Sequence, residues 1–447
     1  MPQPLYKVRE LELARRHFIN SYPPFNVAKR ADPAMLDRKQ DISLYVHIPF
    51  CRTICTYCYY KRFGNPSEGA VTTYLDHLEK EIELYSRQAG GGGRIQTLYI
   101  GGGTPTVLTT GQLRRLVSML RTHFSLGGVE EFCCEMVPHP EPETAEKLAA
   151  LKELGVHRIS FGVESFNEGI LRMHNRHCTR ELYERTYAAV CELGFDNINI
   201  DMMSGLPGET WDNWVDTIET LLSWRPPSIS IYKTEIFYNT TTFTRMRRGK
   251  NAAPLMSDEE EIRHIRYAHD TLRKRGGYAI ANCLHLVRDW KYDTLHYRRI
   301  WEGNELKGLG LSSHSCCRGL LHQNASELGE YYSMLDSGQL PIKRIHKMSA
   351  RDRISQAMVY GLKNLAVNRE DFAERFGVDF TILYSEVIDQ LLRVNAVTLD
   401  DQWLRITPQH YIFTDDICRQ FFLPEYSNMM MSHVERPSEQ AMVQVTA

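Results

Sequence analysis

Three cysteines within eight residues constrain this chain more than any other feature. Cys51, Cys55 and Cys58 form a C-x3-C-x2-C array. Three thiolates at this spacing can hold one iron–sulfur cube and leave its fourth iron without a protein ligand. Such an iron can bind a small molecule, so the array indicates chemistry at the metal. The alternative is a structural zinc ion completed by His47, although zinc ligands usually come as two short clips and no second clip follows nearby.

The composition is that of an ordinary globular protein. A length of 447 residues implies two or three domains. The net charge of -2 and the pI near 6.8 give no bulk attraction to nucleic acid or to an anionic membrane. The first residues lack the apolar core of a secretory signal, and no apolar run reaches the length of a membrane span. The eleven cysteines show no disulfide framework, so we expect the reducing cytoplasm as the compartment. We also expect a monomer.

From residue 41 the chain alternates short β-rich runs with longer amphipathic runs. Predicted strands cover 43–48, 95–100, 130–137, 158–166, 197–206 and 228–236. Predicted helices cover 73–88, 112–124, 143–156, 179–195, 210–224 and 259–276. Because strand and helix alternate, we expect parallel strands joined by crossover helices, which means an α/β fold with a barrel or partial barrel.

The same patterns predict how the chain is divided. An irregular lead-in covers 1–40, the partial barrel 41–240, and a barrel extension or linker region 241–340. Several short helices followed by a strand–turn–helix pattern predict a small, mostly helical, winged-helix-like domain over 341–425. The last stretch, 426–447, lacks a period and is expected to be a flexible tail.

Several polar features lie in the later part of predicted strands or directly after them. They are the cysteine loop, the run GGGTPT at 101–106, Glu135 and Asp201. Ligands of such folds bind at the carboxyl ends of the parallel strands, so these features predict one site on one rim. The glycine run offers successive backbone N–H groups to a carboxylate, amino or phosphate group, and it lacks the lysine of a phosphate-binding loop. A strand-end carboxylate or cap is the structural alternative for Glu135 and Asp201.

The motifs resemble the radical S-adenosylmethionine (SAM) superfamily. The closer resemblance, over about 41 to 422, is to its oxygen-independent coproporphyrinogen III oxidase-like branch. It rests on LYVHIPFC at 44–51, IGGGTPT at 100–106, GVESF at 162–166, NR at 175–176, IDMMSGLPGET at 200–210 and GLGLSSHS at 308–315.

This resemblance implies a radical SAM enzyme with a [4Fe–4S] cluster. In the branch, SAM binds the open iron through its amino and carboxylate groups. One electron, from an external donor of the flavodoxin or ferredoxin type, cleaves SAM to methionine and a 5′-deoxyadenosyl radical that abstracts hydrogen from a small-molecule substrate. Some members bind a second SAM beside the first.

The resemblance also implies roles for single residues. Cys51, Cys55 and Cys58 would hold the cluster, and Tyr45, Gly102 and Glu135 would lie along the first SAM. Residues matching those that touch a second SAM are Tyr57, Gly103, Thr104, Glu164, Arg176 and Asp201. Glu164 stands where the porphyrinogen oxidases carry a glutamine, and a surface ion pair is the structural alternative for Arg176.

Two departures concern the substrate. Porphyrinogen oxidases carry a fourth cysteine two residues after the third, and here Tyr59 and Tyr60 follow Cys58. Haem-handling relatives carry His-Asn-x-x-Tyr-Trp, and the corresponding run from His296 to Trp301 lacks the Asn and Tyr. Both losses weigh against a tetrapyrrole. We therefore expect methyl or methylene transfer from a second SAM to an sp2 carbon of a natural product or heteroaromatic compound, as in the C-methyltransferases and cyclopropanases of the branch. The alternatives are an oxidase acting on a porphyrin, a haem-handling or haem-degrading enzyme or carrier, and a zinc-stabilised scaffold.

Overall fold

A computed structural model describes most of the chain. The described residues are 11, 13–15, 18–30, 42–88, 94–140, 142–248, 253–317 and 319–426. The expected tail at 426–447 lies outside them except for Tyr426, and the expected lead-in at 1–40 is described only in part.

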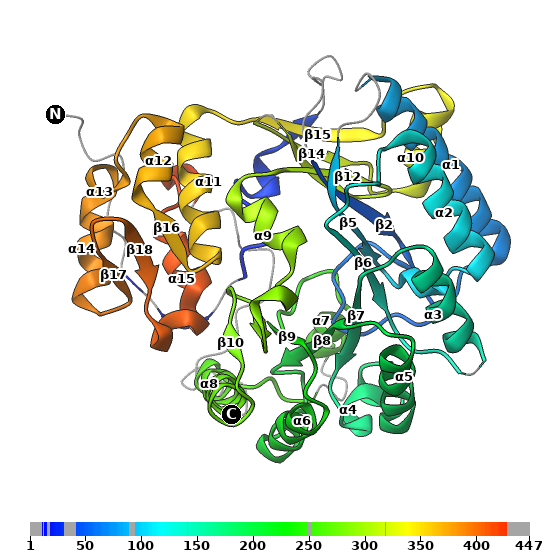
Figure 1. The fold of residues 1–447 in the computed structure, drawn as a ribbon, viewed down its shortest axis with the longest axis horizontal. Helices are drawn as coiled ribbons and strands as arrows, with labels where there is room; N and C mark the ends of the chain where they lie inside the picture. The colour runs from blue at the N-terminus through cyan, green and yellow to red at the C-terminus, as the bar shows by residue number, and fades with distance from the viewer. Residues whose placement is uncertain are drawn as a thin grey trace.

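One large mixed sheet forms the centre of the protein (Figure 1). Its parallel strands are β12 (Glu305–Leu309), β2 (Ile42–Ile48), β5 (Ile95–Gly102), β6 (Glu131–Met136), β7 (Arg158–Glu164), β8 (Asn197–Ser204) and β9 (Ser228–Lys233), given in their order across the sheet. Antiparallel strands extend both ends of this parallel part. They are β13 (His314–Cys317), β14 (Leu320–Asn324), β15 (Ile342–Lys347) and β1 (Lys29–Arg30) beyond β12, and β11 (His285–Val287) and β10 (Ala279–Ile280) beyond β9.

Helices cover the outer side of this sheet, as Figure 1 shows. Those that connect parallel strands are α1 (Glu68–Gln88), α2 (Thr110–His123), α3 (Glu143–Glu153), α4 (Glu168–Met173), α5 (Arg180–Glu192) and α6 (Trp211–Trp224). Between β9 and the end of the sheet come α7 (Thr241–Arg247), α8 (Asp258–Lys274), α9 (Leu295–Glu302) and α10 (Leu328–Asp336). The expected partial (β/α) barrel is confirmed, with each predicted strand and helix up to α8 present.

The strand β2 shows why the barrel forms from this sequence. Leu44, Val46 and Ile48 are fully buried, and Ser43 and His47 on the other face are buried as well. Strands of parallel sheets are covered on both faces, so their side chains are buried along nearly the whole strand. The sequence reading missed β12, because its short run contains Gly308 and two charged residues and follows the region where the alternation fades.

The C-terminal part contains a small second sheet, β16 (Ala366–Asn368), β18 (Trp403–Ile406) and β17 (Val397–Leu399), in that order. Its helices are α11 (Ala350–Lys363), α12 (Arg369–Phe376), α13 (Phe380–Leu383), α14 (Ser385–Arg393) and α15 (Thr414–Arg419). Short 3-10 turns lie at Phe25–Val27, Pro105–Val107, Trp290–Tyr292, Pro408–Phe413 and Pro424–Tyr426. Helices followed by a β-hairpin confirm the winged-helix-like fold. The helix α11 contacts α9, which ties this part to the barrel.

Across the described residues, every helix is too short or too polar to span a lipid bilayer.

Candidate functional site

The three cysteines lie in a loop that follows β2. Short strands β3 (Phe50–Cys51) and β4 (Phe63–Gly64) pair with each other and close this loop. The amide of Cys58 donates to the carbonyl of Cys55 at 3.2 Å, so the last two cysteines share one turn. All three are free thiols that are partly buried.

Each thiol has a hydrogen-bond donor from a different part of the protein. The Thr104 hydroxyl lies 3.7 Å from Cys51 Sγ, and Nη1 of Arg176 lies 3.7 Å from Cys55 Sγ. The backbone amide of Tyr60 donates to Cys58. Burial raises the pKa of the Cys58 thiol to about 12, so a metal must displace its proton. Three soft sulfur ligands with their own donors fit an iron–sulfur cluster, whose sulfurs accept such hydrogen bonds.

The structure does not support the zinc alternative. Both ring nitrogens of His47 are engaged, since Nδ1 lies 3.0 Å from the Tyr45 hydroxyl and Nε2 lies 3.3 Å from the carbonyl of Lys61. Within the described ranges, no three His, Cys, Asp or Glu side chains are grouped as ligands of a single ion. An iron–sulfur cube binds each thiolate at a different iron, so its three cysteines do not need to converge on one ion.

The glycine run, whose first two residues end β5, lies against the cysteine loop. Gly102 has φ +115°, and a Cβ there would lie 2.6 Å from the ring of His47. A Cβ on Gly103 would lie 2.5 Å from the carbonyl oxygen of Phe50. Contacts this short do not occur for real Cβ atoms, so only glycine allows the two segments to approach.

The expected role of the run as a set of free N–H groups needs correction. The amide of Gly103 donates to the carbonyl of Ile48 at 2.7 Å, and that of Thr104 donates to β3 at 2.8 Å. The amide of Gly102 donates to Glu135 Oε2 at 3.0 Å. Three of these N–H groups therefore fix the cysteine loop and a carboxylate and are not free for a ligand.

Glu135 lies near the end of β6 and faces the glycine run. Its Oε1 accepts a 2.8 Å bond from the Tyr99 hydroxyl, besides the bond from Gly102. Burial, with a smaller contribution from Asp201, raises the pKa of Glu135 to about 7. The carboxylate is held in one orientation and keeps lone pairs that can accept further hydrogen bonds.

Arg176 and Glu164 form a second polar pair near the cysteines. Arg176 donates to the Tyr183 hydroxyl at 3.1 Å and to the carbonyl of Gly162, and its Nη1 lies 3.8 Å from Glu164 Oε1. Glu164 has φ +70°, at the point where the register between β7 and β8 shifts. Burial raises the pKa of Glu164 to about 7, although Arg176 opposes this shift. Arg176 is buried, which excludes the surface ion pair considered from the sequence.

Asp201 lies on β8, across the sheet from Glu135. Its oxygens accept bonds of 2.8 Å from the Ser160 hydroxyl and 2.7 Å from the Asn199 amide. Burial raises its pKa, and the bond from Ser160 opposes that shift. The Asp201 carboxylate thus has its hydrogen bonds satisfied within the protein, as the structural alternative expects. Its charge also contributes to the raised pKa of Glu135, so the two carboxylates belong to one site.

Tyr45 and Tyr57 complete the residues expected in the site. The Tyr45 ring stacks on Tyr99 with centroids 6.0 Å apart, and burial, with a smaller contribution from Glu135, raises the pKa of the Tyr45 hydroxyl. Tyr57 is buried, and its ring centroid lies 5.6 Å from that of His174. Burial, with smaller contributions from Cys55 and Glu164, raises the pKa of its hydroxyl. Direct contacts or electrostatic coupling therefore connect all twelve residues singled out in the sequence.

An aromatic stack lies beside the cysteine loop, and the sequence reading missed it. The rings of Tyr59 and Tyr60 stack at 4.4 Å, and Tyr59 lies 4.1 Å from Phe237. Tyr60 is 52% exposed as a whole. Burial of its hydroxyl, with smaller contributions from the charges of Glu135 and Asp201, raises the pKa of that group. Through Tyr60, the stack therefore reaches the protein surface beside the cysteines.

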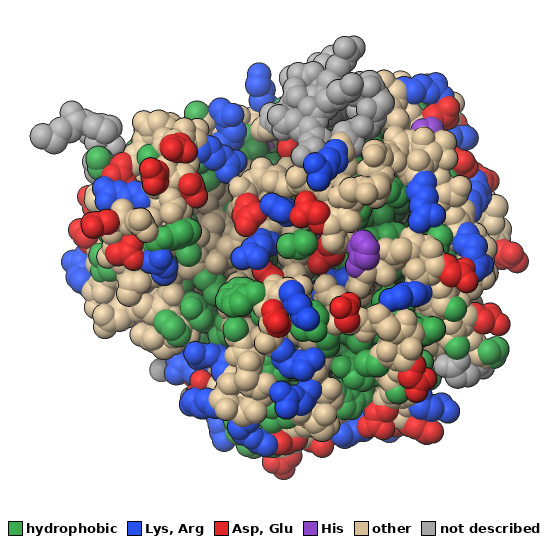
Figure 2. Space-filling view, in the orientation of Figure 1, with side chains coloured by type: hydrophobic (Ala, Val, Ile, Leu, Met, Phe, Trp, Pro, Cys, Tyr) green, Lys and Arg blue, Asp and Glu red, His purple; other side chains and the backbone are tan. Residues whose placement is uncertain are grey.

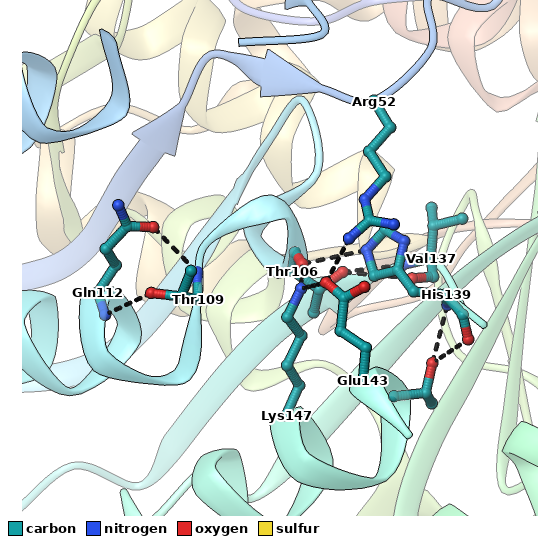
Figure 3. A network of polar contacts seen from close by, with 9 residues as sticks. Arg52, Thr106, Thr109, Gln112, Val137, His139, Glu143 and Lys147 are labelled. Carbon is teal, nitrogen blue, oxygen red and sulfur yellow. Dashed lines mark hydrogen bonds and ion pairs between the residues drawn. The ribbon is translucent and has the colours of Figure 1, made fainter. Parts of the chain in front are cut away.

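A polar network anchors the loops behind the site (Figure 3). Arg52 from the cysteine loop and Lys147 from α3 both bind the carboxylate of Glu143. Lys147 also donates to the carbonyl of Thr106, which lies 3.0 Å from His139 Nε2. The Glu143–Lys147 spacing of four residues on a helix was the only sequence signal for this network.

Comparisons with known proteins agree with this geometry. Residues 45–221 match the model of the radical SAM superfamily. The chain is 30% identical over 415 residues to an oxygen-independent coproporphyrinogen III oxidase from Pseudomonas aeruginosa, covering 88% of each chain. It is 28% identical over 382 residues to the heme chaperone HemW of Bacillus subtilis, covering 85% of this chain and 98% of that one. The structure of coproporphyrinogen III oxidase (HemN) from Escherichia coli shares the fold, with a TM-score of 0.79, 24% identity and coverage of 93% and 99%.

These relatives correct one expectation from the sequence. Methyl or methylene transfer to an sp2 carbon is wrong as the main function, because the full-length relatives are coproporphyrinogen III oxidases and haem chaperones. The loss of the fourth cysteine and of the Asn and Tyr therefore does not separate this chain from the oxidases and haem chaperones. The cofactors of a radical SAM enzyme are a [4Fe–4S] cluster and SAM, and the cysteine loop fits the cluster. The chain belongs to the radical SAM superfamily and, within it, to the oxygen-independent coproporphyrinogen III oxidase-like branch.

Proposed function

We propose that this protein is a radical SAM enzyme that oxidises a reduced tetrapyrrole of the coproporphyrinogen type without oxygen. The observation that carries the proposal is the 30% identity to a coproporphyrinogen III oxidase over 88% of both chains. When bound, the cluster and SAM supply a hydrogen-abstracting radical. The protein supplies the binding site, the orientation of the substrate and the exclusion of water.

The aromatic stack supports a large ring as substrate. Tyr60 occupies the position of the fourth cysteine in the oxidases and stacks with Tyr59, whose other neighbour is Phe237. Exposed aromatic rings at the open side of a site offer a flat apolar surface to a macrocycle. Tyr297, from the altered His-x-x-x-x-Trp run, is coupled to Glu135 and Asp201 and adds a further ring to this site. The loss of one thiol is thus accompanied by a larger aromatic surface.

The proposal assigns the residues named from the sequence to the two cofactors. Cys51, Cys55 and Cys58 hold the cluster, and Tyr45, Gly102 and Glu135 contact the first SAM. A second SAM would lie against Tyr57, Gly103, Thr104, Glu164, Arg176 and Asp201. Two features support this assignment. These groups lie next to one another, and Glu135, which is held by Tyr99 and Gly102, keeps lone pairs that can accept hydrogen bonds from SAM.

Haem carriage is a weaker second candidate, because the histidine of the altered run is buried and one of its ring nitrogens is already paired. His296 is buried, and its Nδ1 lies 2.9 Å from the Thr97 hydroxyl. Its backbone amide donates to Glu131 at 3.1 Å, so the residue is part of the start of α9. A buried histidine in such contacts packs the barrel.

The test uses protein loaded with iron and sulfide under anaerobic conditions. With SAM, a reductant and coproporphyrinogen III, we expect an oxidised porphyrinogen by mass spectrometry, and methionine formed in step with it. Cys55→Ala should fold but take up no cluster and give no product. A protein that leaves the porphyrinogen unchanged while haem addition shifts the Soret band would contradict the oxidase proposal and favour the carrier.

The number of SAM molecules is tested separately by equilibrium dialysis of the loaded protein. We expect two SAM molecules per chain in the unchanged protein and one in Asp201→Asn, because the amide removes the charge that faces the second SAM. A single SAM per chain before any substitution would reject the second site and leave the oxidase proposal standing.

A further inference from the structure

We infer that Arg176, beyond any contact with a second SAM, sets the reduction potential of the cluster through the hydrogen bond from its guanidinium to the Cys55 sulfur. The inference rests on the proposed cluster ligands and not on the identity of the substrate. Arg176 would act through the cluster on the electron transfer that starts the reaction.

The three cluster sulfurs differ in the donors that they receive. Cys51 receives a neutral hydroxyl from Thr104 at 3.7 Å, and Cys58 receives a backbone amide. Only Cys55, among the three, receives a charged donor, the guanidinium of Arg176 at 3.7 Å. Hydrogen bonds to cluster sulfurs and nearby charge are two of the factors that set such potentials. Arg62 acts on Cys51 and Cys58, and Arg176 on Cys51, by charge alone, whereas at Cys55 Arg176 supplies both a charge and a hydrogen bond.

The position of the guanidinium is fixed by the protein. The Tyr183 hydroxyl and the carbonyl of Gly162 hold two of its nitrogens, which leaves the third directed at Cys55. Arg176 is buried, so little water weakens the interaction. A charged donor in this geometry makes a stronger hydrogen bond than a neutral one.

Glu164 opposes this effect. Its carboxylate lies 3.8 Å from Nη1 of Arg176, which is the nitrogen that also faces Cys55. Reduction adds one electron to the cluster, and the added negative charge is favoured by Arg176 and disfavoured by Glu164. The two residues are therefore expected to shift the potential in opposite directions.

The experiment measures the potential of the loaded protein without SAM or substrate. Titanium(III) citrate supplies the electrons at pH 8, where the Glu164 carboxyl is charged, and electron paramagnetic resonance counts the reduced clusters. We expect Arg176→Gln to make reduction at least tenfold less favourable, a shift of about 59 mV to lower potential for one electron. Glu164→Gln should shift the potential upward. Thr104→Val should lower it by less than Arg176→Gln does, and Thr104→Ser should leave it unchanged.

Arg52→Gln is the matched control, because Arg52 lies on the same loop and binds Glu143 and no thiol. Unchanged potentials in both Arg176→Gln and Glu164→Gln would overturn the inference. Equal shifts in Arg52→Gln and Arg176→Gln would also overturn it, since they would reflect total charge alone. If Arg176→Gln does not load, Glu164→Gln and Thr104→Val still decide the result. If the unchanged protein takes up no cluster, the proposed ligands fail instead.

Discussion

Replacing Glu135 with glutamine is expected to remove a pH dependence from the stability of the cofactor-free protein. Burial raises the pKa of this carboxyl from an ordinary 4.5 to about 7. Between these two values the folded chain binds more protons than the unfolded chain, so the free energy of unfolding falls as the pH rises. The difference between 4.5 and about 7 corresponds to about 3 kcal/mol. Because Glu135 is only partly buried, solvent screens this effect, and we expect the free energy of unfolding to change by about 2 kcal/mol.

The assay is urea unfolding of the anaerobic, reduced, cofactor-free protein at several pH values between 5 and 8. The measured quantity is the difference in unfolding free energy between Glu135→Gln and the unchanged protein. This difference should move in favour of the variant by about 2 kcal/mol as the pH rises. The control Glu153→Gln changes an exposed carboxylate on α3 that pairs with Arg114, and its difference should stay nearly constant. A constant difference for Glu135→Gln as well would refute the reasoning.

Two further predictions concern packing and charge. Gly103→Ala should destabilise the protein by about 1–3 kcal/mol in thermal unfolding, because its Cβ would meet the Phe50 carbonyl at 2.5 Å; Gly111→Ala, with no atom closer than 3.9 Å, should not, and equal losses would contradict this. Asp415→Asn should cost about 3–5 kcal/mol, because it leaves the buried ammonium of Lys363, now 2.8 Å from Asp415, without its counter-charge. Adding Lys363→Met should recover most of the lost stability. If stability does not recover, the loss does not come from the unpaired charge of Lys363.

The barrel was predictable because its strands and helices differ in period. Strands such as 43–48 and 228–236 are short β-rich runs, and the helices between them repeat at helical spacing. The strand β12 was not predictable in this way, since its pairing with β2 joins residues far apart in the sequence. Local patterns do not contain such pairings.

The site was predictable in its residues and less so in its contacts. The motifs named Arg176, Glu164 and Thr104, but the sequence assigned all three to a second SAM. Only the fold shows that Arg176 and Thr104 also reach the cysteine sulfurs. In the same way, the glycine run indicated a close approach, but the sequence could not show that the approaching group is the carbonyl of Phe50.

The cysteine loop is also fixed from the side away from the glycine run, through a chain of hydrogen bonds with one direction. The carbonyl of Pro207 can only accept, so Nε2 of His174, 2.9 Å away, must carry the proton. Nδ1 of the neutral ring then accepts the hydroxyl of Thr56 at 2.7 Å. The oxygen of Thr56 in turn accepts from the Thr242 hydroxyl at 3.0 Å. Because Thr56 directly follows Cys55, these hydrogen bonds connect the backbone at Cys55 to α7 and to the loop after β8, and they help to keep the Cys55 sulfur at its distance from Arg176.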